Sequence, residues 1–364
     1  MSVGVGILGA ASRAAIAEVG QRAFSRLANH PTLEIRGVLA DDPDDVGKRF
    51  GDVLAERWVL PDEQPPQQWL DAPLLGLDST ELLAAGIDMV VSGLSAPLSA
   101  ELEPRIGAMG IPVISGSGGL RMEADVPLVV AGVNSAHLDI VKSQSASRGW
   151  NGGFVAVGPL CTATLTAIAI KPIHDAFGVT NLVATTMQAI SGSGQSGLPA
   201  MRIIDNVLPY IHDEEEKMSR ELVKVFGAVN AGKIDSVDVP ISTTCTRVPV
   251  RNGHTISLTL GLKSYASVED IEAVLRDFSG DGLGDDCPLT PKTPIAVMND
   301  PVRPQPFLDS GTGDGRVVSV GRVRPQQAFD NGIGLVVVGH NHERGTWGNV
   351  LMLCEAVVAR GLVG

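Results

Sequence analysis

The residue best placed by its neighbours for covalent chemistry is Cys161, in the run Gly158-Pro159-Leu160-Cys161-Thr162-Ala163-Thr164. An apolar run, 154–157, precedes this turn, and a helix-like run, 165–170, follows it. A strand, a tight turn and a helix start would leave the sulfur at a helix N-terminus, where free backbone N–H groups and the helix dipole favour a thiolate nucleophile. A buried structural cysteine fits the same pattern. Position alone leaves both interpretations open.

A second group of chemically useful residues lies around a predicted hairpin. Two strand-like runs, 239–250 and 255–262, are joined by Arg251-Asn252-Gly253-His254, and Asn-Gly is a strong hairpin signal. Period-2 alternation then places four residues on one face: Arg247, Pro249, Arg251 and His254. The proline implies an edge or a bulge, which would turn Arg247 away. One interpretation is a ligand site, in which an arginine binds a carboxylate and His254 transfers protons. The other is an ordinary polar sheet face.

The N-terminal segment resembles the start of a dinucleotide-binding unit. An apolar strand, 3–8, leads into the spacing Gly6-x-x-Gly9-x-x-Ser12, a predicted helix over 13–28 and a second strand over 33–39. Asp41 follows that strand, where a carboxylate holds the ribose 2′-OH of NAD and repels the 2′-phosphate of NADP. The alternatives are a plain strand-to-helix turn and a solvated loop carboxylate, because three more aspartates lie close by: Asp42, Asp44 and Asp45.

Strands and helices alternate along the first part of the chain, and the pattern changes beyond Gly158. Further strands are predicted at 89–94, 112–114 and 126–130, with helices at 80–86 and 98–109 between them. This alternation predicts a doubly wound, mostly parallel sheet. Strands are then predicted at 181–190, 317–323 and 334–338, a helix at 267–277, and an amphipathic helix at 346–360. The fold class is therefore α/β, with a Rossmann-type domain and an α+β domain that has a mixed or antiparallel sheet.

Composition narrows the class of protein. The chain has 364 residues, 44% of them hydrophobic, which predicts about two folded domains rather than disorder. The net charge of −13 argues against nucleic acid or an anionic membrane as the main partner. Four widely spaced cysteines indicate neither a disulfide framework nor a zinc site. With no predicted signal peptide or membrane helix, we expect a soluble, cytoplasmic protein without a bound metal.

Taken together, these separated motifs resemble the aspartate-semialdehyde dehydrogenase family, nearest to its archaeal and fungal type, over nearly the whole chain. The motifs that carry the resemblance are Leu160-Cys161-Thr162, Gln188-Ala189-Ile190-Ser191-Gly192-Ser193-Gly194, Thr246 to His254, Glu214-Glu215-Glu216-Lys217, Ser117 to Met122, and Gly339 to Gly345. The resemblance implies a dinucleotide-binding domain over 1–158, joined by a C-terminal helix over 345–364. It also implies a catalytic and dimerisation domain over 159–344, and hence a homodimer or homotetramer.

The resemblance assigns a role to each candidate residue. Cys161 becomes the nucleophile, Gln188 orients the acyl intermediate, and His254 is the general acid and base. Arg247 would grip the substrate carboxylate and Glu214 its amino group, while Arg121 and Lys217 would hold the acyl phosphate. The cofactor NAD(P)H would contact Gly6, Gly9, Ala11, Ser12, Asp41, Ser92, Gly93, Ser191, Gly192 and Asn341.

Several residues depart from the family pattern. Leu160 replaces an asparagine, and leucine cannot donate hydrogen bonds to substrate oxygens. Ser12 replaces a glycine, and extra residues near 13–18 remodel the helix start that should receive the pyrophosphate. Asp41 favours NAD over NADP. Trp347 replaces a small residue on the cofactor side.

The resulting prediction is an NAD(P)-dependent oxidoreductase of amino-acid biosynthesis. It would reduce a small-molecule acyl phosphate similar to β-aspartyl phosphate to the semialdehyde, through a thioester on Cys161. Because Leu160 departs from the pattern, an acyl-CoA reductase such as a malonyl-CoA reductase is an alternative. A catalytically inactive relative that acts as a binding protein is a second alternative.

Overall fold

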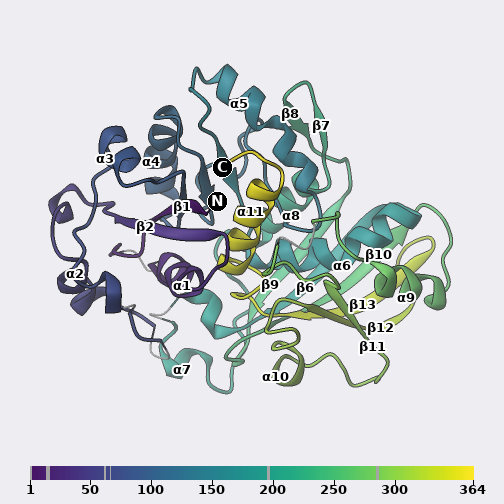
Figure 1. The fold of residues 1–364 in the computed structure, drawn as a ribbon. Coiled ribbons are helices and arrows are strands. Elements are labelled where there is room, and N and C mark those ends of the chain that lie inside the picture. The colour runs from purple at the N-terminus through teal and green to yellow at the C-terminus, as the bar shows by residue number, and fades with distance from the viewer. Residues whose placement is uncertain (1, 14–16, 61–62, 66, 195–196, 284–286) are drawn as a thin grey trace.

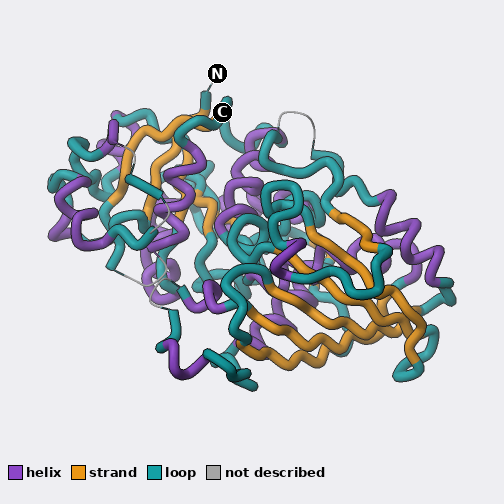
Figure 2. Tube along the Cα trace, turned by 90° about the horizontal axis from the view of Figure 1, so that it is seen from below, coloured by secondary structure: helices purple, strands orange, loops and turns teal. Residues whose placement is uncertain are grey.

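The computed structural model describes residues 2–13, 17–60, 63–65, 67–194, 197–283 and 287–364. Its strands form two separate main sheets, one of five strands and one of six, and a small two-stranded sheet. Figure 1 shows the purple and blue N-terminal elements on one side of the molecule and the green strands of the larger sheet on the other. Viewed from below, the two groups of strands are again separate (Figure 2).

The first sheet is wholly parallel. Its strand order is β2 (Leu33–Leu39), β1 (Val3–Leu8), β3 (Met89–Ser92), β4 (Val113–Ser115) and β5 (Val155–Val157). Strands β1, β3, β4 and β5 are buried along their whole length, as the continuous Val/Ile-rich runs of their sequences require in a doubly wound sheet. The surrounding helices are α1 (Ala17–Leu27), α2 (Phe50–Arg57), α3 (Ser79–Ala84), α4 (Ala96–Ala108) and α5 (Val141–Ser147), with short 3-10 turns at Pro43–Asp45, Gln67–Trp69 and Ser135–Ile140.

The second sheet is mixed. Its order is β11 (Ile295–Met298), β12 (Val318–Gln326), β13 (Gly332–Gly339), β10 (His254–Leu262), β6 (Val179–Gln188) and β9 (Ile241–Arg247). The outer pairs β11–β12 and β6–β9 are parallel and the inner pairs are antiparallel. Helices α6 (Cys161–Phe177), α8 (Glu214–Val225) and α9 (Val268–Asp277) pack against it. The remaining elements are β7 (Ala228–Asn230), β8 (Lys233–Asp235), α7 (Ala200–Ile203), α10 (Pro306–Asp309) and a 3-10 turn at Ile190–Ser193.

The C-terminal helix α11 (Trp347–Ala359) returns the chain to the first sheet. It packs on α1 and β4, and the two chain ends lie side by side (Figures 1 and 2). The predicted position of this helix is confirmed, but the prediction that it is amphipathic is wrong. Residues 347–357 are all buried, because α1 and the sheet cover one side of the helix and the segment around Leu289 and Thr290 binds Glu355 on another.

Two further predictions about strands are wrong. Residues 126–130 form no strand, and only an isolated bridge joins Leu128 to Val157. The expected hairpin of β9 and β10 is absent, since β6 lies between them and pairs with both. The Asn252-Gly253 turn exists, with Gly253 at φ +91°, but it crosses over the end of β6. Arg251 consequently does not face His254 across a ladder.

Candidate active site

The nucleophile candidate lies where the sequence predicted it, at the start of a helix after a buried strand. Strand β5 ends at Val157, and Leu160 is the N-cap of α6, whose first residue is Cys161. The C-terminal segment closes over this turn: a Cβ on Gly345 would lie 2.6 Å from the Cβ of Cys161. Cys161 remains partly exposed and lines a cavity of about 270 Å³. The sulfur can therefore meet a ligand.

His254 is the hydrogen-bond partner of this sulfur. Its Nε2 lies 3.1 Å from Cys161 Sγ, and its Nδ1 accepts the backbone N–H of Ala189 at 3.0 Å. Because Nδ1 is an acceptor, neutral His254 carries its proton on Nε2 and directs it at the sulfur. Burial, followed by the nearby Arg247 guanidinium, lowers the pKa of His254 well below 6.5. The imidazolium therefore forms only transiently.

Burial changes the expected state of the thiol. It raises the pKa of Cys161 to about 12, and the Glu214 carboxylate adds to this effect, while Arg247, the Thr162 backbone amide and Arg121 oppose it. The helix N-terminus thus favours the thiolate as expected, but burial opposes it more strongly. The thiol keeps its proton at neutral pH because desolvation outweighs the helix and the two arginines.

The ends of three strands bring the other catalytic candidates together. Gln188 ends β6 and is in register with Arg247, which ends β9, while His254 begins β10 on the other side of β6. Arg247 donates from Nη1 to Ala189 O at 2.8 Å. All three predicted side chains are buried. A Cβ on Gly192 would lie 2.6 Å from Arg247 Nη1 and 3.1 Å from His254 Cε1, so only glycine permits this approach.

The start of α8 adds one predicted residue to the site and leaves another on the surface. Gln188 donates from Nε2 to Glu214 Oε2 at 3.2 Å. Three glutamates in this first turn suit the positive end of the helix dipole. Lys217 is exposed and pairs with Asp213 at 3.6 Å instead. The structure thus brings Glu214 to Cys161, His254, Gln188 and Arg247, but places Lys217 apart from them.

Two buried residues of α8 were missed by sequence reasoning. Glu221 accepts Arg121 Nη1 at 2.9 Å and the Leu160 backbone N–H at 2.6 Å. Lys224 donates to three carbonyl oxygens of the segment that carries Arg121, at 2.6 to 2.8 Å. Their spacing could have indicated that they are buried, because Glu214, Glu221 and Lys224 lie on the same helix face as apolar side chains.

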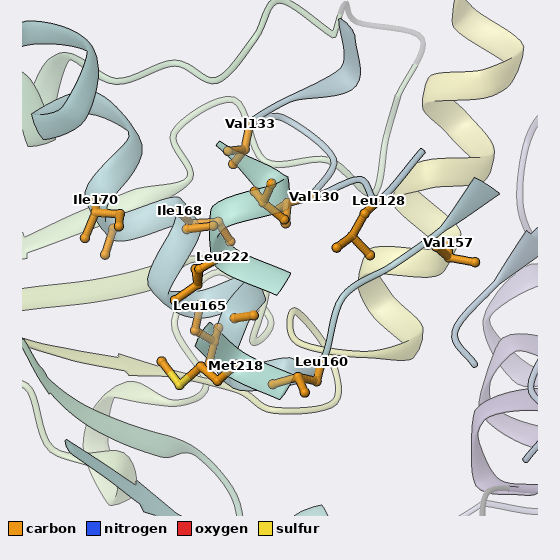
Figure 3. Close-up of a cluster of buried hydrophobic side chains, with 14 of the residues drawn as sticks. Leu128, Val130, Val133, Val157, Leu160, Leu165, Ile168, Ile170, Met218 and Leu222 are labelled. Carbon is orange, nitrogen blue, oxygen red and sulfur yellow. The ribbon is translucent and has the colours of Figure 1, made fainter. Parts of the chain in front are cut away.

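Leu160 fills apolar space beside the nucleophile. It is buried within the core, and Figure 3 shows it near Met218 and Leu165. Leu160 thus packs against α8 and offers no side-chain group that could bind substrate oxygens. The backbone N–H of Leu160 donates a hydrogen bond to Glu221.

The turn after β1 has the close packing of a dinucleotide-binding fold. Gly9 has φ +99°, and a Cβ there would lie 2.6 Å from Gly93 O. Ala11 and Ser12 are buried in this turn, whereas Gly6 lies within β1, where a Cβ would press on Leu39 at 2.8 Å. The predicted Gly9 and Gly93 therefore adjoin each other, and Gly6 serves sheet packing.

Two other residues predicted at the cofactor side differ in accessibility. Asp41 follows β2 and is partly exposed. Ser92 is fully buried and donates its hydroxyl to Glu103 at 2.7 Å, where burial raises the pKa of Glu103 to about 7. The Ser92 side chain is therefore turned into the protein and leaves only its backbone to face a ligand.

The remaining predicted cofactor residues meet at Cys161. Its cavity is lined by Glu18, Cys161, Ser191, Gly192, Ser193, Gly194, Asn341, His342, Thr346 and Trp347. Asn341 donates to Ser191 Oγ at 3.0 Å and accepts Gly253 N–H at 3.0 Å, which fixes the cavity wall. Glu18 was not predicted; its carboxylate pairs with His342 Nδ1 at 2.9 Å. No group of three His, Cys, Asp or Glu side chains that could hold a metal gathers among the described residues.

Two family models match the chain: the semialdehyde dehydrogenase NAD binding domain over residues 4–141 and the semialdehyde dehydrogenase dimerisation domain over residues 170–342. Aspartate-semialdehyde dehydrogenase of Methanothermobacter thermautotrophicus is 34% identical over 355 residues, 98% of this chain and 99% of that protein. The chain belongs to the aspartate-semialdehyde dehydrogenase family. The predicted family, fold class and oxidoreductase class are confirmed.

Other members of the family agree over the full length. Aspartate-semialdehyde dehydrogenase of Candida albicans is 35% identical, with 98% of each chain covered. A solved structure of that enzyme from Candida albicans, with NADP, has a TM-score of 0.86 and 33% identity over 99% of each chain. In the part of the chain that the structure describes, no helix has the length and apolarity needed to cross a membrane.

Proposed function

We propose that this enzyme interconverts β-aspartyl phosphate and aspartate semialdehyde with NAD(P)H, through a thioester on Cys161. The observation that carries the proposal is the 3.1 Å contact between Cys161 Sγ and His254 Nε2, surrounded by Gln188, Arg247 and Glu214. A full-length relationship to aspartate-semialdehyde dehydrogenases supports the choice of substrate.

The proposed roles follow from the chemistry of each side chain. The Arg247 guanidinium binds the substrate carboxylate and the Glu214 carboxylate binds the amino group. Arg121 binds the anion of the leaving group, and the exposed Lys217 side chain would have to leave Asp213 to bind the same anion. Gln188, anchored by Glu214, orients the acyl group through its amide.

The covalent step begins when Cys161 sulfur attacks the acyl carbon and the bond to phosphate oxygen breaks. His254 can take the thiol proton at Nε2 only in the tautomer that carries its own proton on Nδ1, so the Ala189 N–H contact must lengthen as the ring changes tautomer before the sulfur attacks. A bound nicotinamide supplies the hydride that reduces the acyl carbon. His254 then returns its proton to the Cys161 sulfur as the carbon–sulfur bond breaks and the aldehyde leaves.

The assay that tests this function follows aspartate semialdehyde oxidation with NAD and NADP in the presence of phosphate, arsenate or coenzyme A. We expect turnover that requires phosphate or arsenate. Turnover with coenzyme A alone would contradict the proposal and favour an acyl-CoA reductase. Leu160 is the observation behind that second candidate, since its apolar side chain replaces a group that could bind phosphate oxygens. The Cys161–His254 contact argues against a non-catalytic binding protein.

The described residues fit a dinucleotide at two places. Gly9 and Gly93 approach each other in the turn after β1 with no side chain between them, and the cavity beside Cys161 can take the nicotinamide. We propose that Gly9, Ala11, Ser12 and Gly93 hold the phosphate side and that Ser191, Gly192 and Asn341 hold the nicotinamide side. Asp41, at the end of β2, is placed for the adenosine ribose.

We further propose that NAD is preferred over NADP. Asp41 is partly exposed after β2, and its carboxylate would accept the 2′-OH of NAD and repel a 2′-phosphate. We expect wild-type kcat/KM to be at least about tenfold higher with NAD, a difference of about 1.4 kcal/mol, and Asp41→Ser to reduce the ratio severalfold. Asp44→Ser, an exposed change in the same loop, is the control. A wild-type preference for NADP would contradict this prediction.

The match to the family's dimerisation domain indicates a homo-oligomer. We propose that residues 1–158 and 345–364 bind the dinucleotide and that 159–344 form the catalytic and dimerisation domain. Among the described residues, Thr185 and Thr244 are exposed in a cross-strand row with the half-buried Ser257, and this face of the second sheet can meet a second copy. Light scattering should give at least twice the 38.0 kDa subunit mass. None of the four cysteines, all of which lie in the described part of the chain, is in a disulfide, which agrees with the proposed cytoplasmic location.

A further inference from the structure

One buried carboxylate links the nucleophile turn to the proposed anion-binding arginine. Glu221 lies in the middle of α8 and is 3% exposed. Its Oε1 accepts Arg121 Nη1 at 2.9 Å, and its Oε2 accepts the Leu160 backbone N–H at 2.6 Å. Leu160 is the N-cap of α6, one residue before Cys161. A single side chain of α8 therefore bonds to both Arg121 and the N-cap of α6.

The same helix also fixes the segment from which Arg121 extends. Lys224, one turn further along α8, donates to the carbonyl oxygens of Arg121, Glu123 and Val126. Arg121 Nη2 donates to Gly116 O at 2.9 Å, but its Nε is unpartnered among the described residues. The guanidinium is thus held on two sides, and its Nε–H, without a partner among the described residues, is a donor that an anionic ligand could satisfy.

We propose that Glu221 is a positioning residue that fixes the Arg121 guanidinium relative to Cys161. The inference rests on the proposed function only in naming the ligand of Arg121 as the anion of the acyl donor. Glu221 does not touch the reacting atoms. It acts through Arg121, whose positive charge then reaches the nucleophile from a fixed direction.

The contacts also predict how a change at Glu221 affects Cys161 through Arg121. Arg121 is among the groups that lower the pKa of Cys161, and Glu214 is the carboxylate that raises it. Loss of Glu221 should therefore displace Arg121 and weaken its effect on the pKa of Cys161. Glutamine in place of Glu221 retains an oxygen for the Leu160 amide, but its NH2 group faces a guanidinium that only donates. Glu221→Gln should thus keep the contact to the Leu160 amide and lose the contact to Arg121.

The test measures alkylation of Cys161 by anionic iodoacetate and by neutral iodoacetamide, with peptide mass spectrometry to isolate this thiol. The ratio of the two rates reports positive charge near the sulfur. We expect Glu221→Gln to lower this ratio about fivefold, as Arg121→Met does, which corresponds to the displacement of one partly screened charge. In the Arg121→Met background, Glu221→Gln should change the ratio by less than about twofold, because coupled residues are non-additive.

Glu216→Gln is the matched control, since Glu216 lies on the same helix, is exposed and pairs only with Arg220 among its described contacts. Its ratio should stay at the wild-type value. If Glu221→Gln does not fold, Glu221→Asp keeps the charge but is too short for both contacts, and it should give a smaller fall. An unchanged ratio, a higher ratio, equal slowing with both reagents, or additive effects with Arg121→Met would overturn the proposal. Because alkylation needs no substrate, failure of the phosphate-dependent assay would leave this result intact.

Discussion

Replacing Cys161 with serine is expected to lower kcat by at least about 10⁴-fold, as loss of a covalent nucleophile does in other enzymes. A serine hydroxyl holds its proton far more tightly than a thiol, and His254, with a pKa well below 6.5, is too weak a base to remove it. The fold should not change, because the smaller side chain fits under Gly345 and α6 keeps its N-terminus. Steady-state kinetics and thermal unfolding check both parts.

The matched control for that substitution is Cys245→Ser. Cys245 is buried on β9 near Thr186, which can bond to a hydroxyl as it does to the thiol. We expect this variant to retain most of its activity. If Cys161→Ser kept near wild-type turnover, or if Cys245→Ser lost as much activity as Cys161→Ser, the thioester mechanism would be wrong.

Replacing His254 with asparagine is expected to lower kcat by about 10²- to 10⁴-fold, the usual contribution of a general acid and base. Asparagine can place a donor near the sulfur but cannot accept and return a proton. Substrate binding through Arg247 and Glu214 should persist, so KM should change much less than kcat. The steady-state kinetics should be measured from pH 6 to pH 10. The rate at which iodoacetamide alkylates Cys161 should be measured over the same pH range.

The pH dependence of that alkylation follows from the lowered pKa of His254 and the raised pKa of Cys161. With a thiol pKa of about 12, the wild-type rate should rise about tenfold per pH unit without a plateau below pH 10. His212→Asn, an exposed histidine, is the control and should behave as wild type. A plateau near neutral pH would show a resting Cys161–His254 ion pair and contradict the proposed protonation states.

The parallel sheet and the helix start at Cys161 could be predicted because they depend on local patterns. Apolar runs broken by glycine turns predict buried parallel strands, and a turn between strand and helix predicts the start of α6 at Cys161. The hairpin prediction failed because the Asn252-Gly253 turn is local, whereas the pairing of β6 with both β9 and β10 involves residues more than fifty positions away. Arg247 and His254 still meet, on the two sides of the end of β6.

The protonation state of Cys161 could not be predicted from its own helix. Distant segments raise its pKa: the backbone of Gly345 near the C-terminus packs on Cys161, and the Glu214 carboxylate at the start of α8 repels the thiolate charge. Glu221 and Lys224 were missed for a related reason. Charged residues on a helix usually face water, and only the packing of α8 against the Arg121 segment shows that these two are buried.

The central claim, that the acyl group passes through Cys161, is tested most directly by a rapid-mixing burst experiment. The enzyme is mixed with aspartate semialdehyde and NAD or NADP in buffer free of phosphate, arsenate and coenzyme A, and reduced cofactor is followed by absorbance. We predict a burst of one equivalent per active site and a thioester on Cys161 by peptide mass spectrometry. Addition of phosphate should then start steady turnover. Steady turnover without any acceptor, or a burst of equal size in Cys161→Ser, would contradict the claim.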